Sequence, residues 1–410
     1  MRCFFAILSV AMLLIACNKD DSEVPEDKIS QMTVLVYIAG ENYLSSYIYD
    51  ELKEMREGSK GIYPEDNFVV YVDNASTFTK PYLIRLKNGV TVDSVSMEES
   101  LSSDPEVLKR ILNKTMTDYP AREYGLVLWG HASGWFIKSD SIAYTQAFAR
   151  RKAYGVDNGQ NSNLIDSGKW INMWTLSKVI ESIGQKLKFI FADCCQFQCV
   201  ESAYQLRNCC DYIIASPAEI PAAGAPYNTI VPAMFNRQPT FYQLMADAYF
   251  AQTINGKKEP ISVIKTSEMQ NLALATKTVL TTIVPRFEKA TNPDLNGLIY
   301  YQGSEVSGQK NMFDMNDFIL KYAEADEYDT WKLAFDRAVI YRTPVEELNG
   351  IWMSNGQINF RSFTITEERF GGMSMFIPQQ YYTWSSIINH NITIRSTSWY
   401  YAAGYQQVGW

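Results

Sequence analysis

The sequence predicts an α/β protein: a three-layer α/β/α sandwich with a mostly parallel central sheet, continued by a more helical C-terminal part. From residue 31 onward, short apolar runs alternate with stretches of helical period. Continuous apolar strands separated by helices are typical of a parallel sheet covered on both faces. Hydrophobic residues make up 47% of the 410 residues, which is enough to bury a large core and excludes a disordered chain.

Buried strands are expected at residues 33–39, 67–72, 125–129, 187–191 and 212–215. Residues 82–95 alternate between polar and apolar and contain Asn88-Gly89, a strong signal for a β-hairpin. Asp104 followed by Pro105 predicts the start of a helix, because Asp caps a helix and Pro is tolerated in its first turn.

Further helices are expected near residues 174–183, 197–207, 242–254, 270–284 and 315–323. A late strand is expected at residues 372–377. Residues 136–170 lack a clear period and are rich in Ser, Asn, Gly and Asp, which predicts a long exposed loop.

The amino terminus reads as a targeting segment. Residues 4–15 form an apolar run that is too short to span a bilayer and fits a secretory signal. Leu14-Ile15-Ala16-Cys17 resembles a bacterial lipobox, so we expect residues 1–16 to be a signal peptide and Cys17 to be lipidated. The alternative is an ordinary signal peptide in which Cys17 is incidental.

Residues 17–30 are polar and charged and are expected to form a flexible tether. Lys19-Asp20-Asp21 resembles the surface-export signal of Bacteroidetes lipoproteins. We therefore expect an exported lipoprotein of the outer membrane, displayed at the cell surface, with the periplasmic face as the alternative. The lipid anchor would be its only membrane contact.

Charge and histidine content limit the chemistry. The formal net charge of −8 argues against a nucleic-acid binder, which needs a basic face. The chain has two histidines, so a mechanism that uses imidazole must use His131, His390 or both. His390 lies in a polar and aromatic tail, where we expect a surface or structural role.

Two of the expected strands end at chemically reactive side chains. His131 follows the strand at residues 125–129, and Cys194-Cys195 follows the strand at residues 187–191. Functional groups collect beyond the carboxyl ends of parallel strands, and a thiol needs a base such as imidazole to become a nucleophile. From these residues alone, a structural histidine and a packed cysteine remain the alternative.

The sequence around these residues resembles the clostripain family of cysteine peptidases. Residues 126–135 (LVLWGHASGW) resemble the family's catalytic-histidine segment, and residues 191–195 (FADCC) its nucleophile strand. Residues 215–221 resemble a downstream substrate-pocket loop, residues 34–42 the first strand and residues 371–378 a late strand. The five matches occur in family order and span most of residues 31–380.

The resemblance implies a caspase-like fold with a core at residues 31–235 and residues 236–410 as the C-terminal part of the same peptidase. It implies that Cys195 is the nucleophile, since Cys195 keeps an Asp two residues before it and Glu201 six residues after it. His131 would be the acid–base partner. The backbone N–H groups of Cys195 and of the region at Ala132 would hold the oxyanion.

The same resemblance implies a basic substrate. Asp193 would lie under the pocket for the side chain that precedes the scissile bond, with Ser216 and Glu219 in the substrate-binding loop. A carboxylate in a partly dry pocket selects Arg or Lys, because a neutral side chain would leave it unpaired. We therefore expect an endopeptidase that cleaves proteins or peptides after Arg or Lys, and that acts as a monomer.

The sequence departs from the family pattern at three places. Ala132 stands where Gly is expected, and would be strained if the backbone there has positive φ. Cys194 stands where Ala is usual, so oxidation of the Cys194–Cys195 pair is a hypothesis for silencing the enzyme. Gln196-Phe197-Gln198 replaces a small apolar run.

The remaining cysteines do not predict a metal. Cys194, Cys195, Cys199, Cys209 and Cys210 have no nearby His and no CxxC pairs, so we expect no zinc site. Cys199 is expected to pack in the core. The sequence does not decide whether any of these cysteines form a disulfide. It also does not decide whether the protein needs calcium, which part of the family requires. No other cofactor is expected.

Arg150, Arg151 and Lys152 form a basic run within the expected loop. In a protease with basic specificity this run is a candidate self-cleavage site, and a solvated charge run is the alternative. A different class of function also remains open. Nine Trp and 26 Tyr residues would suit a non-catalytic surface lipoprotein that binds glycans or proteins on a degenerate peptidase fold.

Overall fold

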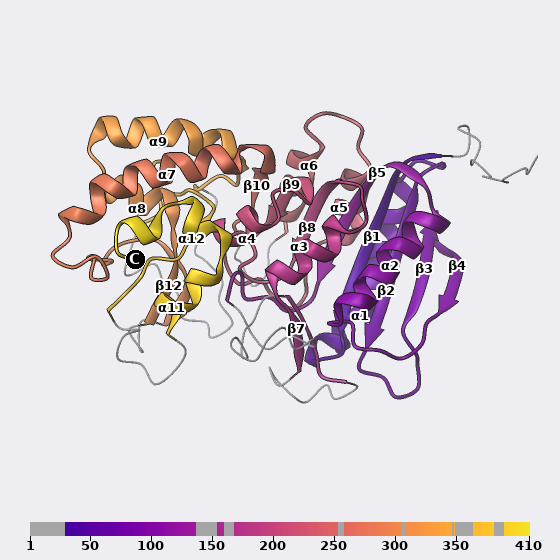
Figure 1. Ribbon diagram of the computed structural model, residues 1–410. Helices are drawn as coiled ribbons and strands as arrows, with labels where there is room; N and C mark the ends of the chain where they lie inside the picture. Colours follow the sequence, from indigo (N-terminus) through magenta and orange to yellow (C-terminus); the bar gives the residue numbers. More distant parts are fainter. Residues whose placement is uncertain are drawn as a thin grey trace, which may run out of the picture.

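The computed structural model describes residues 29–136, 154–159, 168–252, 258–304, 309–346, 348, 364–380 and 389–410. Its central feature is a nine-stranded sheet in the order β13-β10-β9-β8-β5-β1-β2-β3-β4 (Figure 1). The central strands pair in parallel and are β9 (Cys210–Ala215), β8 (Leu187–Asp193), β5 (Ala121–Trp129), β1 (Ser30–Gly40) and β2 (Asn67–Asn74). The five strands expected from the sequence are these five.

Antiparallel strands close both sides of the sheet. At one edge lie β3 (Tyr82–Lys87) and β4 (Val90–Ser96), and at the other lie β10 (Ser262–Lys265) and β13 (Val339–Arg342). Asn88 and Gly89 join β3 to β4 with φ angles of 51° and 83°. Positive φ at both positions is the signature of a type I′ hairpin turn, so the expected hairpin is confirmed.

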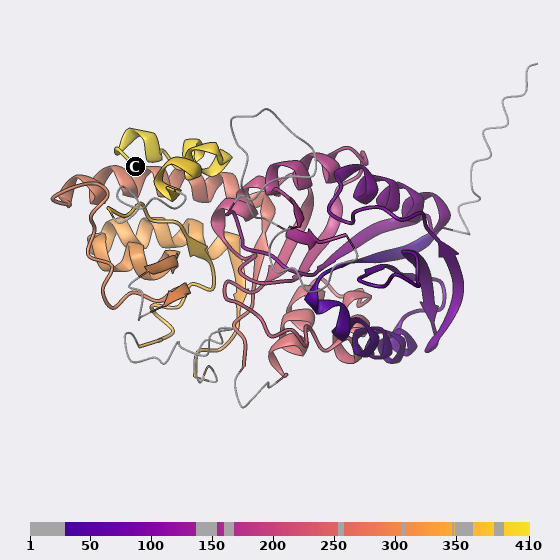
Figure 2. The ribbon, with the colours of Figure 1, turned by 90° about the horizontal axis from the view of Figure 1, so that it is seen from below.

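Helices cover both faces of the sheet, and Figure 2 shows the resulting three layers. One face carries α2 (Pro105–Asp118), α3 (Met173–Glu181) and α4 (Val200–Gln205). The other face carries α1 (Ile48–Gly58), α5 (Tyr227–Met234) and α6 (Phe241–Phe250). The Asp104 side chain caps α2 by accepting a hydrogen bond from the Glu106 N–H, as expected. The α/β/α fold predicted from the sequence is therefore confirmed.

The C-terminal part packs against the end of the sandwich that holds β13 (Figure 1). It contains a three-stranded sheet of β11 (Tyr300–Ser304), β12 (Gln309–Asp314) and β14 (Ser374–Met375). Around this sheet lie α7 (Met269–Ile283), α8 (Met315–Tyr322), α9 (Ala325–Ala338), α11 (His390–Thr393) and α12 (Ser398–Ala402). Its apolar residues belong to the same core cluster as those under α2 and α3. A division at residue 235 stays a prediction, and the main sheet extends beyond that residue through β10 and β13.

The expectation of one long exposed loop at residues 136–170 is wrong for its described residues. Here β6 (Tyr154–Asp157) pairs with β7 (Lys169–Ile171), and Tyr154 and Trp170 are buried. The Tyr154 hydroxyl donates to the carbonyl oxygens of Tyr37 and Trp129 at 3.0 and 3.2 Å. Strands this short carry too few residues to show a period.

Several expectations concern residues that the structure does not describe. Arg150, Arg151 and Lys152, the signal peptide at residues 1–16, Cys17 and the tether up to residue 28 all lie outside the described residues. Within the described part of the chain, no helix combines the length and apolar character needed to span a membrane.

Candidate active site

The register of two neighbouring strands brings His131 and Cys195 to one place. Trp129 of β5 is paired with Asp193 of β8, so His131 and Cys195 each lie two residues beyond the same rung of the ladder. Both side chains line a cavity of about 240 Å³, together with Tyr43, Trp170, Glu219 and Gln302. The cavity lies at the carboxyl edge of the sheet, beyond the ends of the neighbouring strands β5 and β8, and open α/β sheets bind ligands at this edge.

The chain turns sharply after Cys195. Gln196 has a φ of 56°, a left-handed conformation that costs a non-Gly residue about 1 kcal/mol or more. Its N–H donates to the Ala218 carbonyl at 2.7 Å, and its Oε1 accepts from Gln302 Nε2 at 3.1 Å. These bonds hold the turn that leaves Cys195 at the edge of the cavity.

The Cys195 thiol is held by the loop after β9. The Ile220 N–H donates to Sγ at 3.5 Å, and Sγ contacts the Ile220 carbonyl oxygen at 3.8 Å. Burial raises the pKa of Cys195 to about 12, and the charges of Glu219 and Asp193 act in the same direction, against a lowering by the Ile220 hydrogen bond. The resting thiol is therefore protonated at neutral pH.

The segment at His131 is tied to β6. The His131 carbonyl accepts from the Gly155 N–H at 2.8 Å, and Ala132 forms a bridge with Tyr154. The imidazole ring packs on Tyr43, with ring centroids 4.6 Å apart. Ala132 is not among the positive-φ residues of the described chain, so it fits its backbone without strain.

Asp193 is buried beneath the cavity. Its Oδ2 accepts from the Tyr227 hydroxyl at 2.8 Å and from the Ala225 N–H at 3.1 Å. Burial raises the pKa of Asp193 to about 6, while these two hydrogen bonds oppose the rise. The other carboxylate oxygen, Oδ1, has no hydrogen-bond partner among the described residues.

A second carboxylate, Glu51 of α1, lies against the same spot. A Cβ placed on Gly224 would come within 2.6 Å of Glu51 Oε1 and 2.9 Å of Asp193 Oδ2, so both acids flank this glycine, whose φ is +61°. Burial, and then the charge of Asp193, raise the pKa of Glu51 to about 10. Glu51 Oε2 also lacks a hydrogen-bond partner in the part of the chain that the structure describes.

Sequence reasoning missed Glu51. It shares the buried face of α1 with Ile48, Leu52 and Met55, at the i, i+3, i+4, i+7 spacing of an apolar stripe. A carboxylate inside an apolar stripe is the sequence signal that could have identified Glu51, because a buried charge needs a partner or a function.

The comparison with protein families decides the identity. The model of the clostripain family matches residues 36–407, which include every residue of this cavity. The chain belongs to the clostripain family. The fold, the family and the enzyme class of cysteine-type peptidase expected from the sequence are thereby confirmed.

Individual members of the family are distant in sequence and close in fold. Clostripain of Hathewaya histolytica is 23% identical over 238 residues, which cover 51% of this chain and only 43% of clostripain. A secreted C11 cysteine protease from Bacteroides thetaiotaomicron, solved with an irreversible peptide inhibitor, is 28% identical with a TM-score of 0.73. The match covers 92% of this chain and 100% of that protein.

An inactive zymogen C11 protease from Parabacteroides distasonis is also similar. It is 25% identical, with a TM-score of 0.69, and the match covers 92% of this chain and 98% of that one. Both solved structures thus extend over the C-terminal part as well as the sandwich.

Other residues expected at this clostripain-family site divide into two groups. Glu219 lines the cavity beside Cys195. Ser216 is buried and does not line it, and its hydroxyl accepts from the Ala218 N–H at 3.1 Å. The structure therefore gives Ser216 a place in holding the loop.

The described cysteines are free thiols: Cys194, Cys195, Cys199, Cys209 and Cys210. Cys194 belongs to the core on one face of the sheet, whereas Cys195 packs against the core on the other face. Because the two side chains pack into opposite cores, a Cys194–Cys195 disulfide would require the backbone to rearrange. Cys199 is buried in the core, as expected.

His390 lies apart from the Cys195 cavity and is packed as expected of a structural residue. Its ring stacks on Phe136, with centroids 4.3 Å apart. Burial lowers the pKa of His390 to about 4.

Proposed function

We propose that this clostripain-family chain is a cysteine endopeptidase that cleaves after Arg or Lys, with Cys195 as nucleophile and His131 as acid–base partner. The observation that carries the proposal is the cavity at the carboxyl edge of the sheet. It is lined by His131 and Cys195 and has two buried acids, Asp193 and Glu51, beneath it.

The proposed mechanism assigns each step to a named residue. The sulfur of Cys195 attacks the peptide carbonyl carbon while its proton passes to His131, which holds the proton until the amine departs. The N–H groups of Cys195 and Ala132 stabilise the oxyanion. His131 gives a proton to the departing amine, which leaves a thioester that water hydrolyses to the acid and the free thiol.

Specificity follows from the charge beneath the cavity. Asp193 Oδ1 and Glu51 Oε2 are buried oxygens without hydrogen-bond partners among the described residues. A guanidinium or ammonium group would pair with them, whereas a neutral or acidic side chain would leave them uncompensated. We therefore assign the selection of Arg and Lys to both carboxylates, with Glu219 at the side of the cavity.

Fluorogenic peptides with Arg, Lys, Ala or Asp before the scissile bond test the proposal. Wild-type protein should cleave the Arg and Lys peptides, and Cys195→Ala and His131→Ala should each lose at least about 10³-fold in kcat. Cys194→Ala is the matched control, since this neighbouring thiol faces the opposite core. Turnover that survives in Cys195→Ala, or an absent basic preference, would contradict the proposal; glycan binding without turnover would favour the non-catalytic alternative.

We also propose self-processing at Arg150, Arg151 or Lys152. The similarity to an inactive zymogen from Parabacteroides distasonis supports a maturation step. Wild-type protein should convert to two chains on a denaturing gel, and Cys195→Ala protein should stay intact. Conversion of the Cys195→Ala protein in the absence of any active enzyme would contradict intramolecular cleavage.

Export on a lipid anchor at Cys17 is part of the proposal, and the secreted relative from Bacteroides thetaiotaomicron supports export. Cys17→Ser should move the protein from the membrane fraction to the soluble fraction. Protease added to intact cells should remove a surface-displayed protein and spare a periplasmic one. Sedimentation of the released domain should give the mass of a monomer.

A further inference from the structure

The imidazole of His131 packs against two aromatic rings in the Cys195 cavity. The Tyr43 ring lies 4.6 Å from it and the Trp170 ring 6.4 Å from it, measured between ring centroids, with tilts of 47° and 48°. All three side chains line the cavity. His131 is half-buried and Trp170 is buried, whereas Tyr43 is 46% exposed. The two rings therefore limit how far the imidazole can turn.

The backbone that carries these rings is tied to the short strand β6. Tyr43 follows Asn42, whose side-chain amide donates to the Val156 carbonyl of β6 at 2.9 Å. Trp170 is the middle residue of β7, which pairs with β6. The same strand holds the backbone of His131 through a hydrogen bond to its carbonyl. The imidazole and both rings thus share one support.

The mechanism proposed above places a positive charge on this imidazole. A Cys195 thiol whose pKa is about 12 gives up its proton during the attack, and His131 then carries the charge until the amine departs. The imidazolium needs an environment that favours a cation, because burial alone favours the neutral ring. The rings that touch it are therefore part of how the charge is stabilised.

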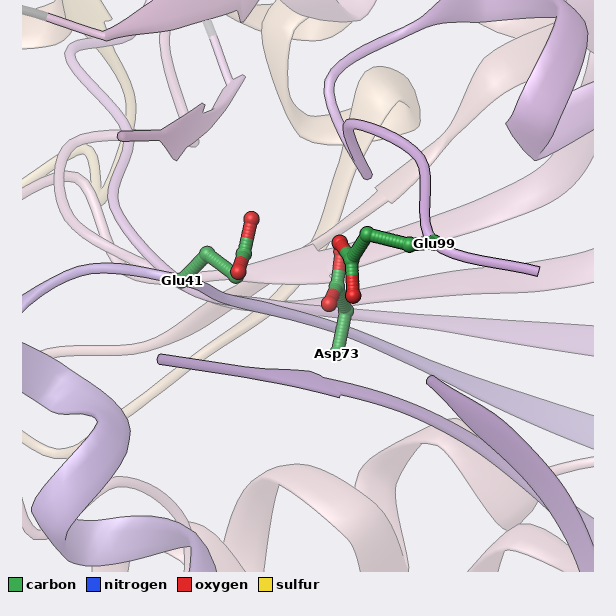
Figure 3. A group of neighbouring side chains, drawn as sticks. All are labelled: Glu41, Asp73 and Glu99. Atoms are coloured by element: carbon green, nitrogen blue, oxygen red, sulfur yellow. The ribbon is translucent and has the colours of Figure 1, made fainter. Parts of the chain in front are cut away.

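Two groups of acids lie at this edge of the sheet. Asp193 and Glu219 line the cavity with His131, and the proposed specificity pairs them with the basic side chain of the substrate. The other group is Glu41, Asp73 and Glu99, whose carboxylates approach one another beside the ends of β1 and β2 (Figure 3). None of these three described acids lines the cavity. With a basic substrate in place, the contact with Tyr43 is available to the imidazolium.

We propose that Tyr43 is a positioning residue for catalysis: its ring holds the imidazole of His131 at the cavity wall and stabilises the imidazolium. An aromatic ring attracts a cation that lies within about 6 Å of its centroid, and the 4.6 Å contact is inside that range. The attraction comes from the ring and not from the hydroxyl, so phenylalanine can replace Tyr43. The proposal rests on the proposed role of His131 as acid–base partner.

Kinetics of two substitutions at residue 43 test the proposal. Tyr43→Leu keeps an apolar cover on the imidazole but removes the aromatic ring, so kcat for an Arg peptide should fall about fivefold while KM changes less than about twofold. Tyr43→Phe should keep the wild-type kcat. Tyr47→Leu is the matched control, since Tyr47 is 39% exposed and does not line the cavity. A loss confined to KM, or equal kcat in the Tyr43→Leu and Tyr43→Phe proteins, would overturn the proposal.

Proton NMR of His131 in Cys195→Ala protein gives a readout that needs no turnover. The chain has two histidines, so adding His390→Gln assigns the remaining imidazole resonances. The pH at the midpoint of their titration should fall by about 0.5 pH unit with Tyr43→Leu and stay in place with Tyr43→Phe. If wild-type protein has no turnover, the proposed function fails. An unshifted or higher midpoint in the Tyr43→Leu protein, alongside normal wild-type turnover, refutes only the role of Tyr43.

Discussion

At the scale of single residues, the pocket beneath Cys195 differs from the expected one by one carboxylate. The family resemblance drew attention to Asp193 because that residue lies two positions before the nucleophile. Glu51 is 142 positions away from Asp193 in the sequence, and the fold brings both to Gly224. Proximity of this kind could not be read from the sequence, because it depends on how α1 packs under the loop after β9.

Replacing Glu51 tests its role in specificity. Glu51→Gln should lower kcat/KM for Arg and Lys peptides about tenfold, or roughly 1.4 kcal/mol, mainly through KM, since one of the two carboxyl groups proposed to pair with the basic side chain is lost. Glu57→Gln is the control on the same helix, where Glu57 is exposed and pairs with Lys60. Steady-state kinetics on both proteins would show Glu51 to be unimportant if their KM values agree.

The proposed recognition of basic substrates by Asp193 should depend on pH. Burial raises the pKa of Asp193 to about 6, so the carboxyl group is ionised at pH 7.5 and becomes neutral as the pH falls through 6. Below that value kcat/KM for an Arg peptide should fall about tenfold per pH unit. A pH profile of Asp193→Asn provides the comparison, and an unchanged acidic limb in that protein would assign the effect to another group.

At the scale of elements, the long apolar strands were predictable and the short connecting elements were not. β5, which leads to His131, and β8, which ends at Asp193, are largely buried and appear in the sequence as continuous apolar runs. β6 and β7 have four and three residues, too few to show a pattern, and α5 contains Pro232 inside the helix. Tertiary contacts, such as those of the Tyr154 hydroxyl, determine these elements.

Removing that hydroxyl tests the contribution of β6. Tyr154→Phe should lower the free energy of unfolding by about 1–3 kcal/mol, because two buried carbonyl groups, of Tyr37 and Trp129, lose a donor. Tyr49→Phe is the control, since Tyr49 is 77% exposed. Urea unfolding of both proteins measures the difference, and equal values would mean that β6 is held by other contacts.

At the scale of the whole molecule, the C-terminal part and the sandwich share one core, and His390 lies where they meet. That residues 236–410 are the C-terminal part of the same peptidase unit stays a prediction, and the sequence alone did not show that β10 and β13 complete the main sheet. β10 and β13 have four residues each and join the sheet from distant parts of the sequence, so no local sequence pattern predicts them. Packing of His390 on Phe136 was likewise not visible, although its structural role was expected.

His390 should make stability fall in acid. Its folded pKa of about 4 is below the ordinary value of 6.5, so the unfolded chain takes up the proton first. The stabilisation is complete above pH 6.5 and is lost as the pH falls toward 4, about 1–2 kcal/mol by pH 5. Urea unfolding at pH 7.5 and 5.0 should show a smaller loss for His390→Gln than for wild type. An equal loss in both would show that other groups cause the dependence.

The protonated state of Cys195 also bears on how the thiol withstands oxidation. Peroxides and disulfides react with the thiolate and hardly with the thiol. A thiol whose pKa is about 12 presents almost no thiolate to such oxidants between turnovers. The nucleophile is therefore expected to stay reduced between turnovers when oxidants are present.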